Sequence, residues 1–444
     1  MNEAREVYLV DHVRTPFSQA NPLNPDDDVF GKKWGLELAA HALIDMFDNR
    51  LPNKGSTLKR ENVSEVLIGI SLPQHENGTF GGRIPIFMAN FPFSVPATTF
   101  DKQDGSGMAT LHVGFGNISM GYSDVVVSLG LDQSTRVPVH SYNGKVTVYG
   151  MPPDKLMLDP NNKWYNDDLY DWKTSRLLFQ AAQKLAEEEA ELFTKDEMDK
   201  LGARSHNLAE KALENGYFKE EIVSIKGHKE GEPDNQIEIE EDQSIKKAIT
   251  VENIANMPSI STPGWAGGYK NPVFSKEAYI AKFATEEGII TTGNSAPMND
   301  GASVCLLMSK IALEQYNLKP MAKIISIGFA GVDPTVRGRG VVPASQMALK
   351  HADLKAEDID FWEINESFSI VALNAANKLE IDWENKMNIH GGAMAIGNPP
   401  SATGPRISAT LARILKEKNA KYGLAAMSCA GGQGTAVVIE NIDM

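Results

Sequence analysis

The sequence predicts a layered α/β protein built around a parallel sheet. Short apolar runs rich in β-branched residues, such as Val7–Val10 and Val66–Ile70, have the length and composition of buried strands. Segments with helical periodicity lie between the runs, and apolar residues recur three and four positions apart from Trp34 to Phe47. Because strands that alternate with helices usually form βαβ units, we expect a parallel sheet covered by helices.

The first third of the chain continues this alternation. Arg14–Phe17 ends the first strand with a proline, and a glycine-rich loop follows the second strand at His75–Gly82. The remaining elements expected here are a short helix at Ile84–Asn90, an extended run ending at Phe100, a helix from Met108 toward Ile118, and a strand at Asp124–Gly130.

Composition indicates a soluble protein of ordinary globular type. The 444 residues are 42% hydrophobic and 23% charged, which leaves room for two to four compact units. The net charge of −15 argues against binding to nucleic acid or to anionic membranes. Two cysteines are too few for a disulfide framework, and no apolar run approaches the roughly 20 residues of a membrane span. We therefore expect a cytoplasmic protein.

The character of the chain changes between residues 134 and 265. Helical stretches are expected from Ser175 to about Leu192 and from Lys195 to about Asn215. Glu230–Gln243 is acidic and poor in core residues, which is typical of a solvated loop. The segment is therefore interpreted as an inserted, mostly helical and loop-rich subdomain that carries substrate contacts.

The second half repeats the pattern of the first. Its expected elements are strands at Lys323–Gly328, Asp360–Ile364, Tyr422–Cys429 and Thr435–Glu440, with helices at Pro343–His351, Asn365–Leu379 and Ser401–Lys418. The strands at Val125 and Leu424 occupy matching places in the two halves. Identity between the halves is low, so the repeat is a weak signal by itself.

One side chain is expected to be exposed where a strand turns into a helix. Asp104 follows the extended run that ends at Phe100, and Gly105 and Gly107 open the helix behind it. The N–H groups of a helix start would lie beneath the carboxylate. This turn is the first candidate for a functional site.

Seven motifs, in this order and spacing, are very specific for one fold. They are Val13–Phe17, Asp104–Met108, Gly293–Ala302, Gly331–Pro334, Trp362–Phe368, Gly391–Gly397 and Cys429–Gly434. Together they resemble the thiolase family over nearly the whole chain, and the closing segment and length are most similar to degradative 3-ketoacyl-CoA thiolases, which are acetyl-CoA C-acyltransferases of lipid metabolism.

The resemblance implies a five-layer α/β/α/β/α core of two similar halves. The expected division is an N-terminal half at residues 1–133, a loop domain at 134–265, a return to the N-terminal half at 266–302, and a C-terminal half at 303–444. The family also implies a homodimer or homotetramer, an acyl-CoA substrate with coenzyme A as its carrier, and neither a metal nor a covalently bound cofactor.

Several site residues follow from the family motifs. Cys429 matches the acid/base cysteine, in a glycine-rich turn that favours a lowered thiol pKa. Asn365 matches the asparagine that holds a water, and Gly431 is the candidate backbone donor of an oxyanion hole with the N–H of Asp104. The serine that touches CoA falls near Ser295 or Ala296.

Two substitutions separate this chain from the family pattern. Asp104 stands where the family has its nucleophilic cysteine, and Asn398 stands in place of the histidine of the Gly-His-Pro motif. An acyl group on Asp104 would be a mixed anhydride, and a carboxylate is a poor nucleophile toward a thioester. A covalent acyl-enzyme is therefore not expected, although Asn398 keeps a hydrogen-bond donor for a thioester carbonyl.

Two hypotheses from different classes remain at this point. In the first, Asp104 is a general base and Cys429 the acid of hydrolytic retro-Claisen or retro-aldol cleavage. In the second, the protein is catalytically silent and serves as a CoA-thioester-binding protein or as the partner of another subunit. Non-covalent thiolysis and a deliberately introduced Asp104 are the remaining interpretations.

Other polar residues receive simpler interpretations. Cys305 is expected in the core, and Glu366 is expected to place charge at a helix start. His75 and His390 lie in glycine-rich loops and are considered as acid/base groups near the site. Arg337 and Arg339 are expected on the solvated surface. No histidine or cysteine spacing suggests a metal site.

Overall fold

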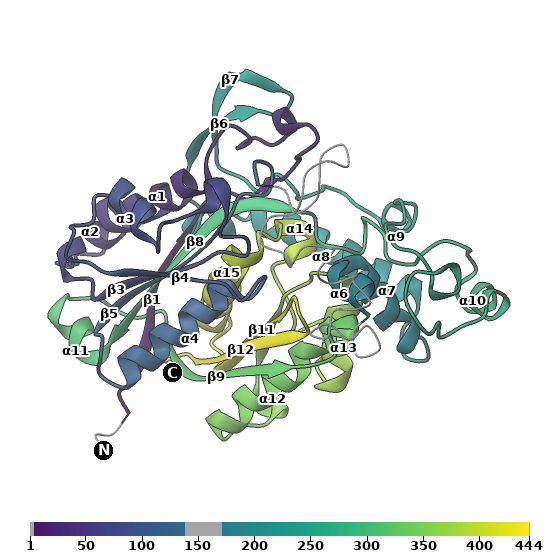
Figure 1. Cartoon of the computed structure of the whole chain (residues 1–444). Coiled ribbons are helices and arrows are strands. Elements are labelled where there is room, and N and C mark those ends of the chain that lie inside the picture. The colour runs from purple at the N-terminus through teal and green to yellow at the C-terminus, as the bar shows by residue number, and fades with distance from the viewer. Residues whose placement is uncertain (1–3, 138–170, 444) are drawn as a thin grey trace, which may run out of the picture.

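The computed structural model describes residues 4–137 and 171–443. A ten-stranded sheet runs through the molecule in the order β10-β11-β12-β9-β1-β8-β5-β3-β4, with β2 paired to β8 (Figure 1). Its strands are β1 (Val7–Arg14), β2 (Ser18–Gln19), β3 (Glu65–Gly69), β4 (Ala97–Phe100), β5 (Val125–Asp132), β8 (Asn299–Ser309), β9 (Ala322–Gly331), β10 (Phe361–Ile364), β11 (Tyr422–Cys429) and β12 (Gln433–Glu440).

The sheet is mixed, so the expectation of a parallel sheet was wrong in part. Strand β3 pairs in parallel with β4 and β5, and β10 pairs in parallel with β11. The central strands β1, β8, β9 and β12 pair antiparallel to their neighbours. The reason is local for β12, because three residues are enough to turn the chain from Cys429 to Gln433 but not to make a crossover.

The strand order confirms that the two halves repeat. In the first half β1, β8, β5 and β3 follow one another, with two antiparallel pairs and then a parallel pair. In the second half β9, β12, β11 and β10 show the same sequence of pairings. Strands β5 and β11 thus occupy equivalent places, as expected from the positions of Val125 and Leu424.

Helices cover the sheet on both faces and fill the space between the halves. The helices of the two halves are α1 (Gly35–Asp45), α2 (Leu51–Asn53), α3 (Arg83–Met88), α4 (Ser106–Ser119), α11 (Lys310–Gln315), α12 (Val341–Ala352), α13 (Ser369–Lys378), α14 (Ala393–Ile396) and α15 (Pro400–Lys418). One core packs α1 on the first half, and another packs α12 and α13 on the second. A third core joins α4 and α15 to strands of both halves, so these two helices form the middle layer.

The inserted segment is mainly helical in its described part. It contains α6 (Trp172–Arg176), α7 (Leu178–Glu188), α8 (Lys195–Glu214) and α9 (Val251–Ala255), and α10 (Lys276–Phe283) follows. The helix expected from Lys195 is confirmed, whereas the one expected from Ser175 is broken at Leu177, whose backbone is extended.

The acidic run is a strand and not a loop. Strand β7 (Glu232–Ile239) pairs antiparallel with β6 (Ile225–Lys229), and Gly231 turns the chain between them with a φ of 70°. Ile225 and Ile239 join the core of the first half, while the acidic side chains of β7 face solvent. The acidic composition predicted the exposure of these side chains correctly. It did not predict the strand pairing, which Ile225 and Ile239 stabilise by packing into the core. In the part of the chain described above, no helix is both long and apolar enough to cross a bilayer.

Candidate active site

The turn that carries Asp104 lies where α4 and α15 begin. The turn is closed by Ser106, whose hydroxyl donates to the carbonyl of Gln103 at 2.6 Å and accepts from the N–H of Lys102 at 2.9 Å. A Cβ on Gly107 would lie 1.8 Å from the carbonyl oxygen of Ser401, so glycine allows the two helix starts to meet. The turn is therefore fixed by its own hydrogen bonds and by α15.

Asp104, which we expected to be exposed at the turn, is instead buried and paired with an arginine. Its Oδ2 lies 3.0 Å from Nη2 of Arg337 and accepts the N–H of Ala430 at 2.8 Å. Arg337 belongs to η8 (Pro334–Gly340), the helical turn that follows β9, and 3% of the residue is exposed. The expectation that Arg337 is a surface residue was wrong, because a buried carboxylate needs a charged partner and Arg337 supplies it.

Cys429 lies against the same turn, at the end of β11. A Cβ on Gly105 would be 2.3 Å from Cys429 Sγ, so sulfur and turn are in direct contact. Burial and, next, the charge of Asp104 raise the pKa of the Cys429 thiol to about 12, although Lys102 and Arg337 oppose the shift. The expected lowering of this pKa was wrong, and the thiol keeps its proton at neutral pH.

A second cation flanks the pair. Lys102 Nζ donates to the amide oxygen of Gln433 at 3.0 Å, and Gln433 begins β12 directly after the glycine-rich turn. Its hydrogen-bond partner is neutral, so Lys102 adds positive charge next to the Asp104–Arg337 pair. Gly431, the expected backbone donor, sits in that turn with a φ of 75°, a conformation that glycine adopts without strain.

Asn365 follows β10 and is joined to β11, the strand that ends at Cys429. Its N–H donates to the carbonyl of Ala426 in β11 at 2.9 Å. Its side-chain Oδ1 is buried and has no hydrogen-bond partner among the described residues. An orphaned buried oxygen of this kind suits a water, which agrees with the water-holding role that the family resemblance implies.

Asn398 stands at the start of α15. Its N–H donates to Asn299 Oδ1 at 2.8 Å, and its own Oδ1 accepts from the hydroxyl of Thr403 at 2.9 Å. The helix thus fixes the amide group from one side. Asn398 and Asp104 occupy corresponding ends of α15 and α4, although no hydrogen bond between described atoms joins their side chains.

Ser295 and Ala296 run beside the segment that follows Asn365. Ser295 forms an isolated antiparallel bridge with Phe368, and the N–H of Ala296 donates to the carbonyl of Ser367 at 3.1 Å. The hydroxyl of Ser295 donates to the carbonyl of Thr291. The structure therefore brings both residues next to the Asn365 loop, and their part in CoA binding stays a prediction.

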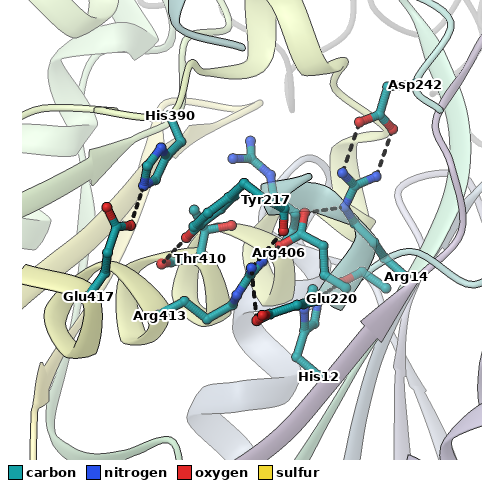
Figure 2. A network of polar contacts seen from close by, with 12 residues as sticks. His12, Arg14, Tyr217, Glu220, Asp242, His390, Arg406, Thr410, Arg413 and Glu417 are labelled. Carbon is teal, nitrogen blue, oxygen red and sulfur yellow. Dashed lines mark hydrogen bonds and ion pairs between the residues drawn. The ribbon is translucent and has the colours of Figure 1, made fainter. Parts of the chain in front are cut away.

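A separate polar cluster accounts for His390. His390 Nε2 lies 2.6 Å from a carboxylate oxygen of Glu417, and its ring stacks on Tyr217 with ring centroids 3.9 Å apart (Figure 2). Glu417 is near the far end of α15, 17 residues after Pro400, which at 1.5 Å per residue is about 26 Å from the start of the helix. His390 is therefore remote from Asp104, and its interpretation as an acid/base group of that site is withdrawn.

The same cluster ties the inserted segment to the core. The guanidinium of Arg14, in β1, bonds Glu221 at 2.7 Å and Asp242 at 2.6 and 2.8 Å (Figure 2). Arg413, in α15, bonds the other oxygen of Glu221 at 2.8 Å. These ion pairs are buried and fully bonded, which marks them as structural.

Glu366 also has a structural role. Its carboxylate is buried, accepts from Ser205 at 2.6 Å and Asn388 at 2.7 Å, and has a pKa raised by burial. Glu366 precedes α13, which begins at Ser369, and its expected contribution of charge at a helix start stays a prediction. Cys305 is buried in the core, as expected. Across residues 4–137 and 171–443, no group of three or more His, Cys, Asp or Glu is arranged to hold a metal ion.

Comparisons with known proteins place the chain in a family. Residues 7–266 match the model of the N-terminal domain of thiolase, and residues 318–441 match that of the C-terminal domain. The protein therefore belongs to the thiolase family, and the fold expected from its motifs is confirmed.

Relatives and solved structures agree over the full length. The chain is 33% identical to a 3-ketoacyl-CoA thiolase of Marinobacter nauticus and 31% identical to one of Hahella chejuensis, each over 99% of both chains. It superposes on the acetyl-CoA acetyltransferase of Bacillus anthracis with a TM-score of 0.78, at 28% identity, over 99% of this chain and 100% of that one. Human mitochondrial 3-ketoacyl-CoA thiolase in complex with CoA shares the fold, with a TM-score of 0.77 at 24% identity, over 99% and 100% of the two chains.

Proposed function

We propose that the protein acts on a β-ketoacyl-CoA or β-hydroxyacyl-CoA and cleaves or forms a carbon–carbon bond without a covalent acyl-enzyme. The observation that carries the proposal is the contact between the Asp104 turn and Cys429, whose thiol keeps its proton beside a carboxylate. The pair combines a proton acceptor with a proton donor at a helix start. The 3-ketoacyl-CoA thiolases among the relatives support the class of substrate.

With a β-ketoacyl-CoA, the second substrate is water. Asp104 takes a proton from water, and the resulting hydroxide adds to the β-carbonyl carbon. The bond between the α- and β-carbons then breaks, which releases a carboxylic acid and leaves the enolate of the shortened acyl-CoA. The Cys429 thiol protonates the α-carbon, and the proton on Asp104 returns to sulfur. With a β-hydroxyacyl-CoA, Asp104 would instead take the hydroxyl proton, and the product would be a carbonyl compound.

One observation favours the second hypothesis, a silent CoA-thioester-binding or partner subunit. Asp104 is the ion-pair partner of Arg337. A proton on Asp104 would leave the buried guanidinium without an opposite charge, which is costly unless the substrate supplies one. The two hypotheses therefore differ in whether the bound substrate becomes negatively charged next to Arg337.

The deciding experiment follows the products of a β-ketoacyl-CoA in ¹⁸O-labelled water, with and without free CoA. Cleavage without CoA that places ¹⁸O in a free acid supports the role of Asp104 as a base acting on water. This cleavage should be lost in D104N and in C429S. C305A is the matched cysteine control, because Cys305 is buried in the core and its thiol donates to the carbonyl of Pro405. If neither a β-ketoacyl-CoA nor a β-hydroxyacyl-CoA is consumed while CoA thioesters still bind, the binding role replaces the catalytic one.

We also propose that the protein is a soluble cytoplasmic homodimer or homotetramer. Phe80 and Phe93 are exposed by 82% and 85%, and both lie near β4, the last strand of the sheet. Exposed aromatic residues beside a sheet edge mark a surface for association. Light scattering should give a mass of at least two chains, whereas a monomer would contradict this part of the proposal.

A further inference from the structure

Arg337 is held rigidly by the elements around it. Next to Arg337 in the chain, a Cβ on Gly338 would lie 2.7 Å from Val371 and 2.8 Å from Leu185, so η8 packs closely on α13 and α7. The N–H of Val332 donates to the carbonyl of Gly432 at 2.7 Å, which joins the strand before η8 to the glycine-rich turn. The backbone on either side of Arg337 is therefore packed in place and joined to the turn that follows Cys429.

One nitrogen of this side chain is unused. Nη2 pairs with Asp104 at 3.0 Å, but Nη1 is buried and has no hydrogen-bond partner among the described residues. A buried charged donor without an acceptor is costly, and structures keep such groups mainly where a ligand or water completes them. Arg14, a buried arginine that is also paired with carboxylates, has acceptors for both terminal nitrogens. Arg406, buried beside Glu363, does leave Nε and Nη2 without a partner, so what distinguishes Arg337 is its place beside Asp104 and the turn that follows Cys429.

The charges around the turn favour an added anion. Arg337 and Lys102 are both positive, and Asp104 supplies one negative charge between them. Asp104 also takes the N–H of Ala430, a donor that could otherwise face a substrate oxygen. The Asp104 carboxylate therefore occupies two of the donors that could bind an anion, Arg337 Nη2 and the N–H of Ala430. Arg337 Nη1 remains available to an oxygen of a bound ligand.

We propose that Arg337 is the anion-binding residue of this site, and that its free Nη1 binds the thioester oxygen that becomes negatively charged when the substrate forms an enolate. This inference rests on the proposed function and identifies the group that would stabilise its intermediate. It also explains how Asp104 could keep its proton once the enolate has formed, because the enolate would replace the carboxylate as the negative partner of Arg337.

Two stable analogues of nearly equal shape separate charge from fit. S-carboxymethyl-CoA carries a carboxylate one carbon beyond the carbon that bears the enolate oxygen, and S-carbamoylmethyl-CoA carries a neutral amide at the same place. Calorimetric titration of the wild type should show tighter binding of the carboxymethyl compound by about tenfold or more, the range of one charge-assisted hydrogen bond. In R337M the ratio should fall to about one, and R337K should keep part of it.

Two further variants make the test specific. R339M is the matched control, since Arg339 is two residues away, pairs with Glu188 and Glu189, and should leave the ratio unchanged. In D104N the internal carboxylate is gone, so the preference for the carboxymethyl compound should grow by about tenfold.

Binding readouts keep this inference distinct from the proposed function. An equal ratio in the wild type and R337M, or no gain in D104N, would show that Arg337 only stabilises Asp104 and would overturn the proposal. Failure of both analogues to bind the wild type would overturn it as well. If the wild type prefers the carboxymethyl compound and R337M does not, but no substrate is turned over, the proposed reaction is refuted and the anion site is still supported. If R337M does not fold, the comparison of R337K with D104N decides.

Discussion

The reactivity of Cys429 gives the sharpest test of the site's electrostatics. Burial and Asp104 raise the pKa of this thiol from its ordinary value of 9.0 to about 12. At pH 8 the thiolate fraction should therefore be about a thousandfold lower than for an unperturbed cysteine, because each pKa unit changes it tenfold. Since the thiolate is the reactive form, alkylation by iodoacetamide should slow in proportion.

The pH dependence separates charge from simple shielding. The alkylation rate of Cys429, followed by mass spectrometry of its peptide, should keep rising tenfold per pH unit beyond pH 10 as long as the protein stays folded. Steric shielding alone would give a slow rate that levels off near pH 9. D104N should speed alkylation, because it removes a charge that raises the pKa, and R337M should slow it, because the guanidinium lowers the pKa. A plateau near pH 9, or the opposite order of the variants, would refute this account.

Three further predictions concern restored chemistry, packing and pH. D104C/N398H, which restores the family's two residues, should form an acyl-enzyme with acetyl-CoA that intact-protein mass spectrometry detects, whereas D104C alone should acylate far more slowly for want of a base. G105A should lower the thermal midpoint, at a cost of about 1–3 kcal/mol for overpacking against Cys429 Sγ, whereas G116A, in open space on the same helix, should be neutral or stabilising by up to about 1 kcal/mol; equal midpoints would contradict the packing. Burial raises the pKa of Glu363 from 4.5 to about 8, so the folded state holds a proton that the unfolded state releases, and stability should fall as pH rises through that window. Thermal midpoints of E363Q should fall less than those of the wild type between pH 5 and 8, and parallel slopes would show that Glu363 does not contribute.

The sequence determined the family, the two-halved α/β fold and the unusual residues at the site. Ordered motifs such as Asp104–Met108 and Cys429–Gly434 could do this because glycine turns and helix starts have strong local signatures. The repeat of the halves was faintly readable from strand positions, and strand pairing confirmed it.

Only the tertiary structure decided which groups lie next to the site residues. Arg337 is 233 positions from Asp104 in the chain (337 − 104), so no spacing rule could join them. The pKa of Cys429 depends on burial and on Asp104, which outweigh the local turn that suggested a lower value. His390 looked close to the site in sequence, yet α15 carries its partner Glu417 to the far end of the helix. Local signals fix elements and turns, but charge and solvation at a site are sums over everything that the fold packs around it.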